Sequence, residues 1–189
     1  MIRKTLALTA AALLCMAAAP AQKAAPQKAA PQKAAPKPAS KAPAARPADA
    51  GAGNPQNLID LMTAAGAKVE ANRREDDSVF VAFTTPIVDF SVQFAGCNPN
   101  GRACQAVLFD ALMAQGAPTL AQINSFNQSS VICRGYQDKG GKPHVTYAAL
   151  VMASDGRDRE RAHVVAWQGC LADFGAFVKD PTGYLAVAP

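Results

Sequence analysis

The chain has 189 residues, a formal net charge of +5 and an apolar fraction of 50%. Residues 1–50 hold eight basic residues and one acidic residue, whereas residues 51–189 hold 11 basic and 13 acidic residues. A nucleic-acid-binding domain carries clustered basic residues in its folded part. The positive charge here lies outside that part, so the sequence predicts no nucleic-acid partner.

The first 21 residues have the three parts of a secretory signal peptide. Arg3 and Lys4 precede a short apolar run at residues 6–14, and Ala-Pro-Ala at residues 19–21 is a cleavage site of the small-x-small type. The apolar run is too short to span a bilayer, because a transmembrane helix needs about 20 residues. We therefore predict that residues 1–21 are a cleaved signal peptide. The mature protein is then periplasmic or secreted and has no transmembrane span.

Residues 22–53 form a low-complexity segment. The pentapeptide Gln-Lys-Ala-Ala-Pro occurs three times in succession at residues 22–36, and Ala, Pro and Lys dominate up to about Gly53. A proline every five residues breaks any helix, and the segment has no branched apolar side chain from which to build a core. It is predicted to be an extended, partly polyproline tether. The tether is either a solvated spacer or a basic arm that contacts anionic lipid or cell-wall polymer.

Four cysteines follow the signal peptide: Cys97, Cys104, Cys133 and Cys170. An even number of cysteines in an exported protein predicts disulfides. Three pairings are open, and we favour Cys97 with Cys104 across a short loop and Cys133 with Cys170. A metal site is the alternative, but it usually needs a Cys-x-x-Cys pair, and no histidine lies close to the first two cysteines in the sequence. No metal and no cofactor are therefore expected.

The folded part is predicted to begin with a helix that is capped by Asn54 and stops at Gly66. Runs of alternating apolar and polar residues then predict strands, and apolar residues at steps of three and four predict further helices. These elements are strands at 67–71, 79–83, 88–94 and 103–113 with a charged turn at 73–77, a helix at 119–129, a hairpin of strands at 132–138 and 143–152, and a helix at 158–179. Residues 181–189 are predicted to be a loose tail.

The order α-β(3–4)-α-β-β-α predicts an α+β domain over residues 54–180. Short alternating strands indicate an antiparallel sheet with helices packed on it in two layers. The last helix carries the main apolar ridge, formed by Val164, Trp167, Leu171, Phe174 and Val178. We expect this ridge to pack against the sheet. The alternative is a seam between two copies in a homodimer.

Two groups of polar residues are candidates for a binding site. Asn124 and Asn127 lie on the semi-buried face predicted for the second helix, where an amide needs a partner. Arg134, Tyr136 and Asp138 alternate along one strand, so their side chains share one side of the sheet. The two asparagines either form a polar binding pocket or tie loops to the helix. The three strand residues are either a recognition strip for a peptide or sugar or a cross-strand polar ladder capped by Asp138.

Four groups of residues occur in a characteristic order along the folded part. They are Gly96-Cys97 with Cys104, then Ile123-Asn124-x-x-Asn127, then Arg134-x-Tyr136-x-Asp138-x-x-Gly141-x-Pro143, and finally Trp167, Leu171, Phe174 and Phe177. This order resembles the YbjN-like domain family of bacteria over about residues 58–178. The chain departs from the family at Phe126, where Trp is expected, and Cys133 and Cys170 are additions that suit an exported version.

The resemblance implies a fold similar to that of type III secretion chaperones and a role in the regulation of sensory transduction. It implies no catalytic activity. The first hypothesis is therefore an exported, non-enzymatic module that binds a protein or peptide partner in the cell envelope. A hydrolase that uses Cys133 and His144 is the enzymatic alternative, since His144 could approach Cys133 across the predicted hairpin. A third hypothesis makes the domain a tethered structural spacer of the envelope.

Overall fold

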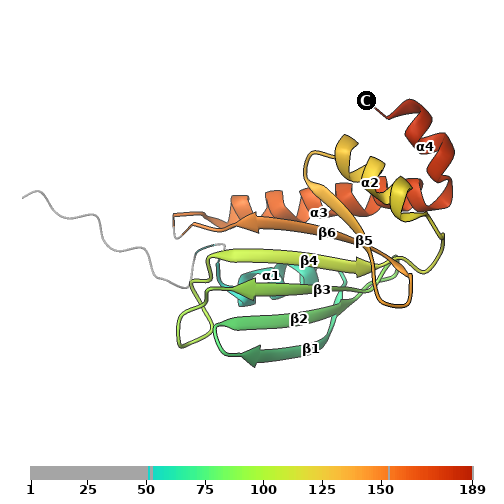
Figure 1. Ribbon diagram of the computed structural model, residues 1–189. Coiled ribbons are helices and arrows are strands. Elements are labelled where there is room, and N and C mark those ends of the chain that lie inside the picture. The colour runs from blue at the N-terminus through green and yellow to red at the C-terminus, as the bar shows by residue number, and fades with distance from the viewer. Residues whose placement is uncertain (1–50, 52, 153, 189) are drawn as a thin grey trace, which may run out of the picture. The chain divides into compact units, whose positions relative to one another are not determined.

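The computed structural model describes residues 51, 53–152 and 154–188. The predicted signal peptide and most of the predicted tether lie outside these residues. The described part contains a six-stranded antiparallel sheet and four helices (Figure 1), which confirms the predicted α+β fold. Among the described residues, no helix has both the length and the apolar character needed to cross a bilayer.

The strand order of the sheet is β1-β2-β3-β4-β6-β5, and every neighbouring pair is antiparallel. The hairpin formed by β5 and β6 joins the sheet through β6, which pairs with β4, so that β5 is the edge strand. Because β5 is 5 residues long, this edge is short. The strands are β1 Lys68–Glu75, β2 Ser78–Thr84, β3 Phe90–Ala95, β4 Ala106–Leu112, β5 Cys133–Gln137 and β6 Pro143–Leu150.

The first two helices begin where their capping residues predict. The side chain of Asn54 accepts a hydrogen bond from the main-chain N–H of Gln56, two residues into the first helix. Thr119 and Gln122 form a reciprocal capping box at the start of the second helix. Each cap satisfies main-chain donors that the first turn of a helix leaves unpaired. The helices are α1 Pro55–Ala64, α2 Leu120–Ser129, α3 Arg157–Lys179 and α4 Pro181–Val187.

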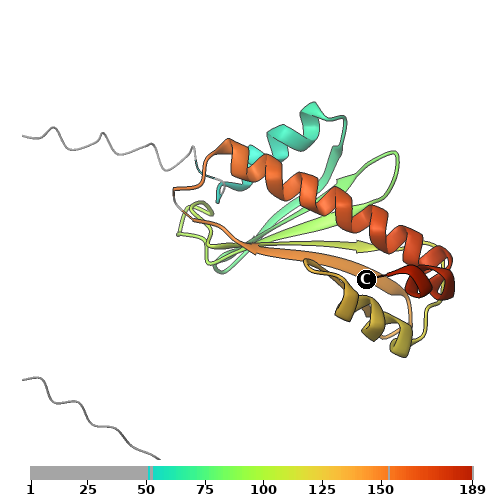
Figure 2. The ribbon, with the colours of Figure 1, turned by 90° about the horizontal axis from the view of Figure 1, so that it is seen from above.

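The core lies between the sheet and α3. Alternate residues of β2, β3 and β4 are buried, and the aromatic ones meet the α3 ridge. The ring of Trp167 lies 5.7 Å from that of Phe90 and 5.5 Å from that of Phe109. Figure 2 shows α3 and α1 along the same side of the sheet. The ridge therefore packs against the sheet, as predicted.

Both predicted disulfides are present. Cys97 is bonded to Cys104, and Cys133 is bonded to Cys170. The first closes the loop between β3 and β4, whereas the second joins the edge strand β5 to α3. All four cysteines lie in the buried core. Disulfides of this kind fit a protein that folds in an oxidising compartment.

Two predictions for the less regular parts were wrong. The predicted charged turn at 73–77 is largely strand, because β1 continues to Glu75 and the turn consists of Asp76 and Asp77 alone. Residues 181–187 of the predicted loose tail form α4. The ring of Tyr184 in this helix lies 5.9 Å from Phe126 and 5.8 Å from Phe177, so α4 is held by aromatic packing. The first segment was predicted as a turn because it is rich in charged residues, and the second was predicted as a loose tail because its helix is only 7 residues long.

Candidate functional site

The face of the sheet opposite α1 and α3 carries Arg134 and Tyr136, two of the residues predicted for binding. On β5, Cys133 and Gly135 are buried toward the helices, whereas Arg134 and Tyr136 are exposed on the other side. The same alternation runs through the strands β2, β3 and β4. We call this side the outer face. It has a polar end near the β5–β6 turn and an apolar end around Ala148.

The polar end is built on Asp110, whose two carboxylate oxygens bind different neighbours. The phenol of Tyr136 donates a hydrogen bond of 2.8 Å to Oδ2, and Nδ1 of His144 lies 2.9 Å from Oδ1. The rings of Tyr136 and His144 are stacked with centroids 4.7 Å apart. Asp138 completes the group, with Oδ2 at 3.8 Å from Nε2 of His144. Residues from three strands, up to 34 positions apart, thus form one connected cluster.

Two groups of this cluster have shifted pKa values. Partial burial, reinforced by the carboxylate of Asp110, raises the pKa of Tyr136, so its phenol stays protonated and acts as a donor. Hydrogen bonds from the main chain of Lys142 and Gly140 lower the pKa of Asp138, which keeps this carboxylate ionised at the turn. Neither shift produces a nucleophile or a proton donor poised near neutral pH.

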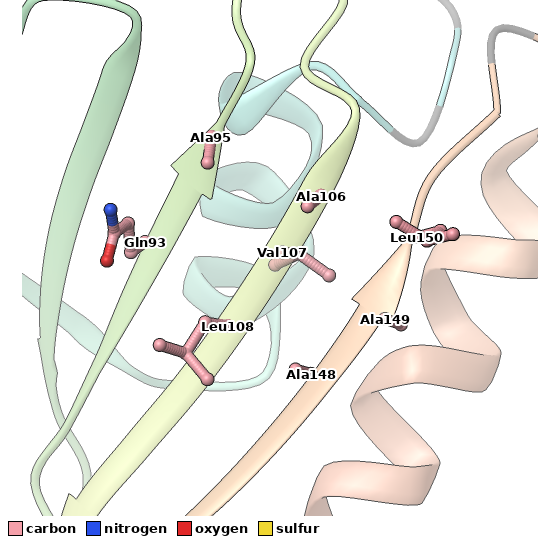
Figure 3. A pocket seen from close by; sticks show the side chains of 8 residues that line it. All are labelled: Gln93, Ala95, Ala106, Val107, Leu108, Ala148, Ala149 and Leu150. Carbon is pink, nitrogen blue, oxygen red and sulfur yellow. The ribbon is translucent and has the colours of Figure 1, made fainter.

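The apolar end of the outer face is a shallow hollow of about 360 Å³. Figure 3 shows its side chains on three neighbouring strands, with α1 behind the sheet. Alanines make up much of its lining, and Leu150, which also lines it, is 72% exposed. The residues that line the hollow are Gln93, Ala95, Ala106, Val107, Leu108, Ala148, Ala149 and Leu150.

Asn127 has a structural role at the edge of the sheet. The main-chain N–H of Gly135 donates to its Oδ1 at 2.7 Å, and its Nδ2 donates to the main-chain oxygen of Gly135 at 3.0 Å. These two bonds replace the pair that a neighbouring antiparallel strand would form. The side chain therefore satisfies the free edge of β5 at its centre and makes strand addition there unfavourable.

The other two tentative binding residues do not join the cluster. A terminal nitrogen of Arg134 donates to the main-chain oxygens of Ser130 and Cys133, at 2.9 and 2.6 Å, so this side chain braces the loop before β5. Asn124 is exposed on α2, which corrects the prediction that it shares a semi-buried face with Asn127. Leu120 at the start of α2 is 64% exposed as well.

The structure does not bring together the pair that a thiol hydrolase would need. Cys133 faces the helices, and its sulfur is bonded to Cys170. The imidazole of His144 lies on the outer face against Asp110 and Tyr136. The expectation that His144 approaches Cys133 across the hairpin was therefore wrong, because adjacent strands present these side chains to opposite faces.

Sequence reasoning missed Asp110 and His144 as members of the cluster. Asp110 is the one charged residue in the run Ala106–Leu112, and this interruption of an apolar strand is a signal that could have been used. His144 was considered, but for the wrong face. Within the residues that the structure describes, no group of three or more His, Cys, Asp or Glu side chains is arranged to hold a metal ion.

The chain was compared with family models, with curated proteins and with solved structures. None of the three comparisons gave a match. The resemblance to the YbjN-like family and to type III secretion chaperones therefore remains a prediction.

Proposed function

We propose that the chain is an exported, non-enzymatic module that binds a protein partner in the cell envelope through the outer face of its sheet. The observation that carries the proposal is this face, which has an apolar hollow at one end and the connected polar cluster at the other. A partner segment can place apolar side chains over Ala148 and hydrogen-bonding groups near Tyr136. Recognition surfaces typically combine an apolar area with polar groups that form hydrogen bonds.

The edges of the sheet support a partner that lies flat on the face. Asn127 occupies the β5 edge at Gly135. The opposite edge, β1, is exposed along its whole length, carries five charged residues and contains a register irregularity between Val69 and Ala71. Charged side chains and bulges on an edge strand oppose the addition of another strand. The remaining large surface of the sheet is the outer face.

The chemistry of the described residues supports a binding role. Both cysteine pairs are bonded in the core, so neither supplies the thiolate that a cysteine hydrolase requires. Tyr136 is held protonated, and Asp110 is occupied by two neighbours. The resemblance to the YbjN-like family, which has no catalytic activity, points in the same direction.

The compartment is part of the same proposal. The two disulfides fit an oxidising environment, and the first 21 residues have the composition of a signal peptide. Together they support a location in the periplasm or outside the cell. The predicted tether would then give the domain reach toward a partner, either as a spacer or as a basic arm.

The proposal is tested with two matched baits. Leu150→Glu places a charge on the outer face, and Val165→Glu places the same charge on α3, where the side chain is exposed to a similar degree (65% against 72%). Recovery of partner from envelope extract should fall at least tenfold for Leu150→Glu and stay unchanged for Val165→Glu. Equal recovery by both variants would contradict binding through the outer face. Thiol titration of the native exported protein should find no free sulfhydryl group.

A further inference from the structure

Glu160 is buried at the start of α3, in a stretch where its neighbours are exposed. Its residue exposure is 5%, whereas the side chains of Arg159 and Arg161 are 62% and 66% exposed and that of Asp158 is fully exposed. A carboxyl group is rarely buried without a partner, because losing water is costly for its charged form. Glu160 lies where α3 contacts α1, so the burial of its carboxyl group affects this contact.

Three polar atoms on the sheet-facing side of α3 are buried without a hydrogen-bond partner in the described structure. They are Oε1 of Glu160, Nε2 of His163 and Nε1 of Trp167. The three residues follow one another at steps of three and four along the helix, so they form one stripe. The second nitrogen of His163 is engaged, since Nδ1 lies 2.8 Å from the hydroxyl of Tyr147 on β6.

Glu160 and His163 both line a small cavity of about 10 Å³. Its other walls are the apolar side chains of Leu58 from α1 and of Phe94, Val107 and Phe109 from the sheet. A single water needs roughly 10–15 Å³ and two or more polar partners. The cavity is at the lower limit of that size, and Glu160 and His163 supply the two partners. The site fits one internal water that bridges the carboxyl and the imidazole.

The surroundings favour the neutral form of both groups. Burial raises the pKa of Glu160 to about 7, opposed by Arg157 on its own helix and reinforced by Asp60 on α1. Burial also lowers the pKa of His163, helped by Arg159 and opposed by Asp155. From the sheet, Tyr147 is the ionisable neighbour, and burial raises its pKa, so it stays neutral as well. Glu160 is therefore the residue of the stripe that changes its charge near neutral pH, by losing its proton as the pH rises.

We propose that Glu160 is a proton-operated latch that holds α1 against α3 while it is protonated and loosens this contact when its proton passes to solvent. An ionised carboxylate needs more hydration than one internal water provides. A groove of about 220 Å³ lies between α1 and α3, and its walls include Glu160 itself, Asp60 of α1 and the cationic side chains of Arg157 and Arg161. Widening this groove hydrates the carboxylate and also separates it from Asp60. The inference is independent of the proposed function.

The sign of the effect follows from the direction of the shift. A carboxyl group whose pKa is higher in the folded than in the unfolded state contributes stability that is fully present below its unfolded pKa of 4.5, falls as the pH rises, and is lost once the pH has passed the folded pKa of about 7. Between about pH 6 and about pH 8.5, Glu160 alone should raise the unfolding equilibrium constant roughly tenfold. This is the part of the pH dependence that a Glu160→Gln variant removes.

The test uses Trp167, the single tryptophan of the chain, as a probe inside the stripe. In the full-length native protein, its emission should shift to the red as the pH rises through 7, and amide exchange in α1, corrected for intrinsic rates, should accelerate. Both changes should be absent in Glu160→Gln. They should be retained in Asp158→Asn, which removes an exposed carboxylate from the same helix turn.

Two results would overturn the latch. One is a native protein whose Trp167 emission and α1 exchange are the same at pH 6 and pH 8.5. The other is a Glu160→Gln variant that shows the same transition as the unmodified chain. If Glu160→Gln folds poorly, the unmodified chain still keeps the latch open to refutation, because a titration without a transition in Trp167 emission and α1 exchange overturns it.

Discussion

The Cys133–Cys170 disulfide should stabilise the domain more than the Cys97–Cys104 disulfide does. A cross-link stabilises mainly by restricting the unfolded chain, and the effect grows with the length of the closed loop. The cysteines are 37 positions apart in the first case and 7 in the second. The chain-entropy relation then gives about 4 kcal/mol for the long loop and about 2 kcal/mol for the short one.

The assay is equilibrium urea unfolding of two double variants, Cys133→Ala/Cys170→Ala and Cys97→Ala/Cys104→Ala, at one fixed pH. Both variants remove two buried sulfur atoms, so the difference between them isolates the loop length. The first should lose about 1.5 kcal/mol more than the second and show a steeper dependence on urea, because its unfolded chain is more expanded. The reasoning would be refuted if the first variant lost no more stability than the second.

Two further predictions concern β5 and its supports. Gly135→Ala should lower the free energy of unfolding, measured in urea, by about 1–3 kcal/mol, because a Cβ atom there would lie 2.5 Å from the ring of Phe174. Gly169→Ala on α3 is the control. A Cβ atom there meets open space, so this variant should gain about 1 kcal/mol of helix stability. Asn127→Ala should cost about 1–2 kcal/mol and produce concentration-dependent association in sedimentation, because it exposes the β5 edge. Asn124→Ala is the control, and association in that variant as well would contradict the edge argument.

The sequence allowed the helix starts and the faces of the strands to be predicted, because these depend on local chemistry. Asn54 and Thr119 cap helices through hydrogen bonds to residues two or three positions away. The exposure of Arg134 and Tyr136 on one side of β5 follows from the period of two along a strand. The disulfide pairing was also predicted correctly, since one choice closed a short loop and the other joined a strand to the helix packed on it.

The candidate site was harder to predict because it depends on long-range register. Asp110 reaches Tyr136 only because β6 lies between β4 and β5, a strand order that the local pattern does not indicate. Asn124 and Asn127 lie one turn apart on α2, yet only Asn127 faces Gly135. Glu160 occurs among charged residues at a helix start, a place where acidic residues are usually solvated. In each case the role of the residue depends on the side chains and main-chain groups that the fold places beside it, and the residue type alone does not indicate them.

Site-specific photocrosslinking gives the most direct test of the outer face as the binding surface. A photoreactive side chain replaces Leu150 on the outer face in one exported protein and Val165 on α3 in another, and adducts formed in intact cells are mapped by mass spectrometry. The account predicts a protein adduct from position 150 and none from position 165. Adducts from position 165 without any from position 150 would contradict it.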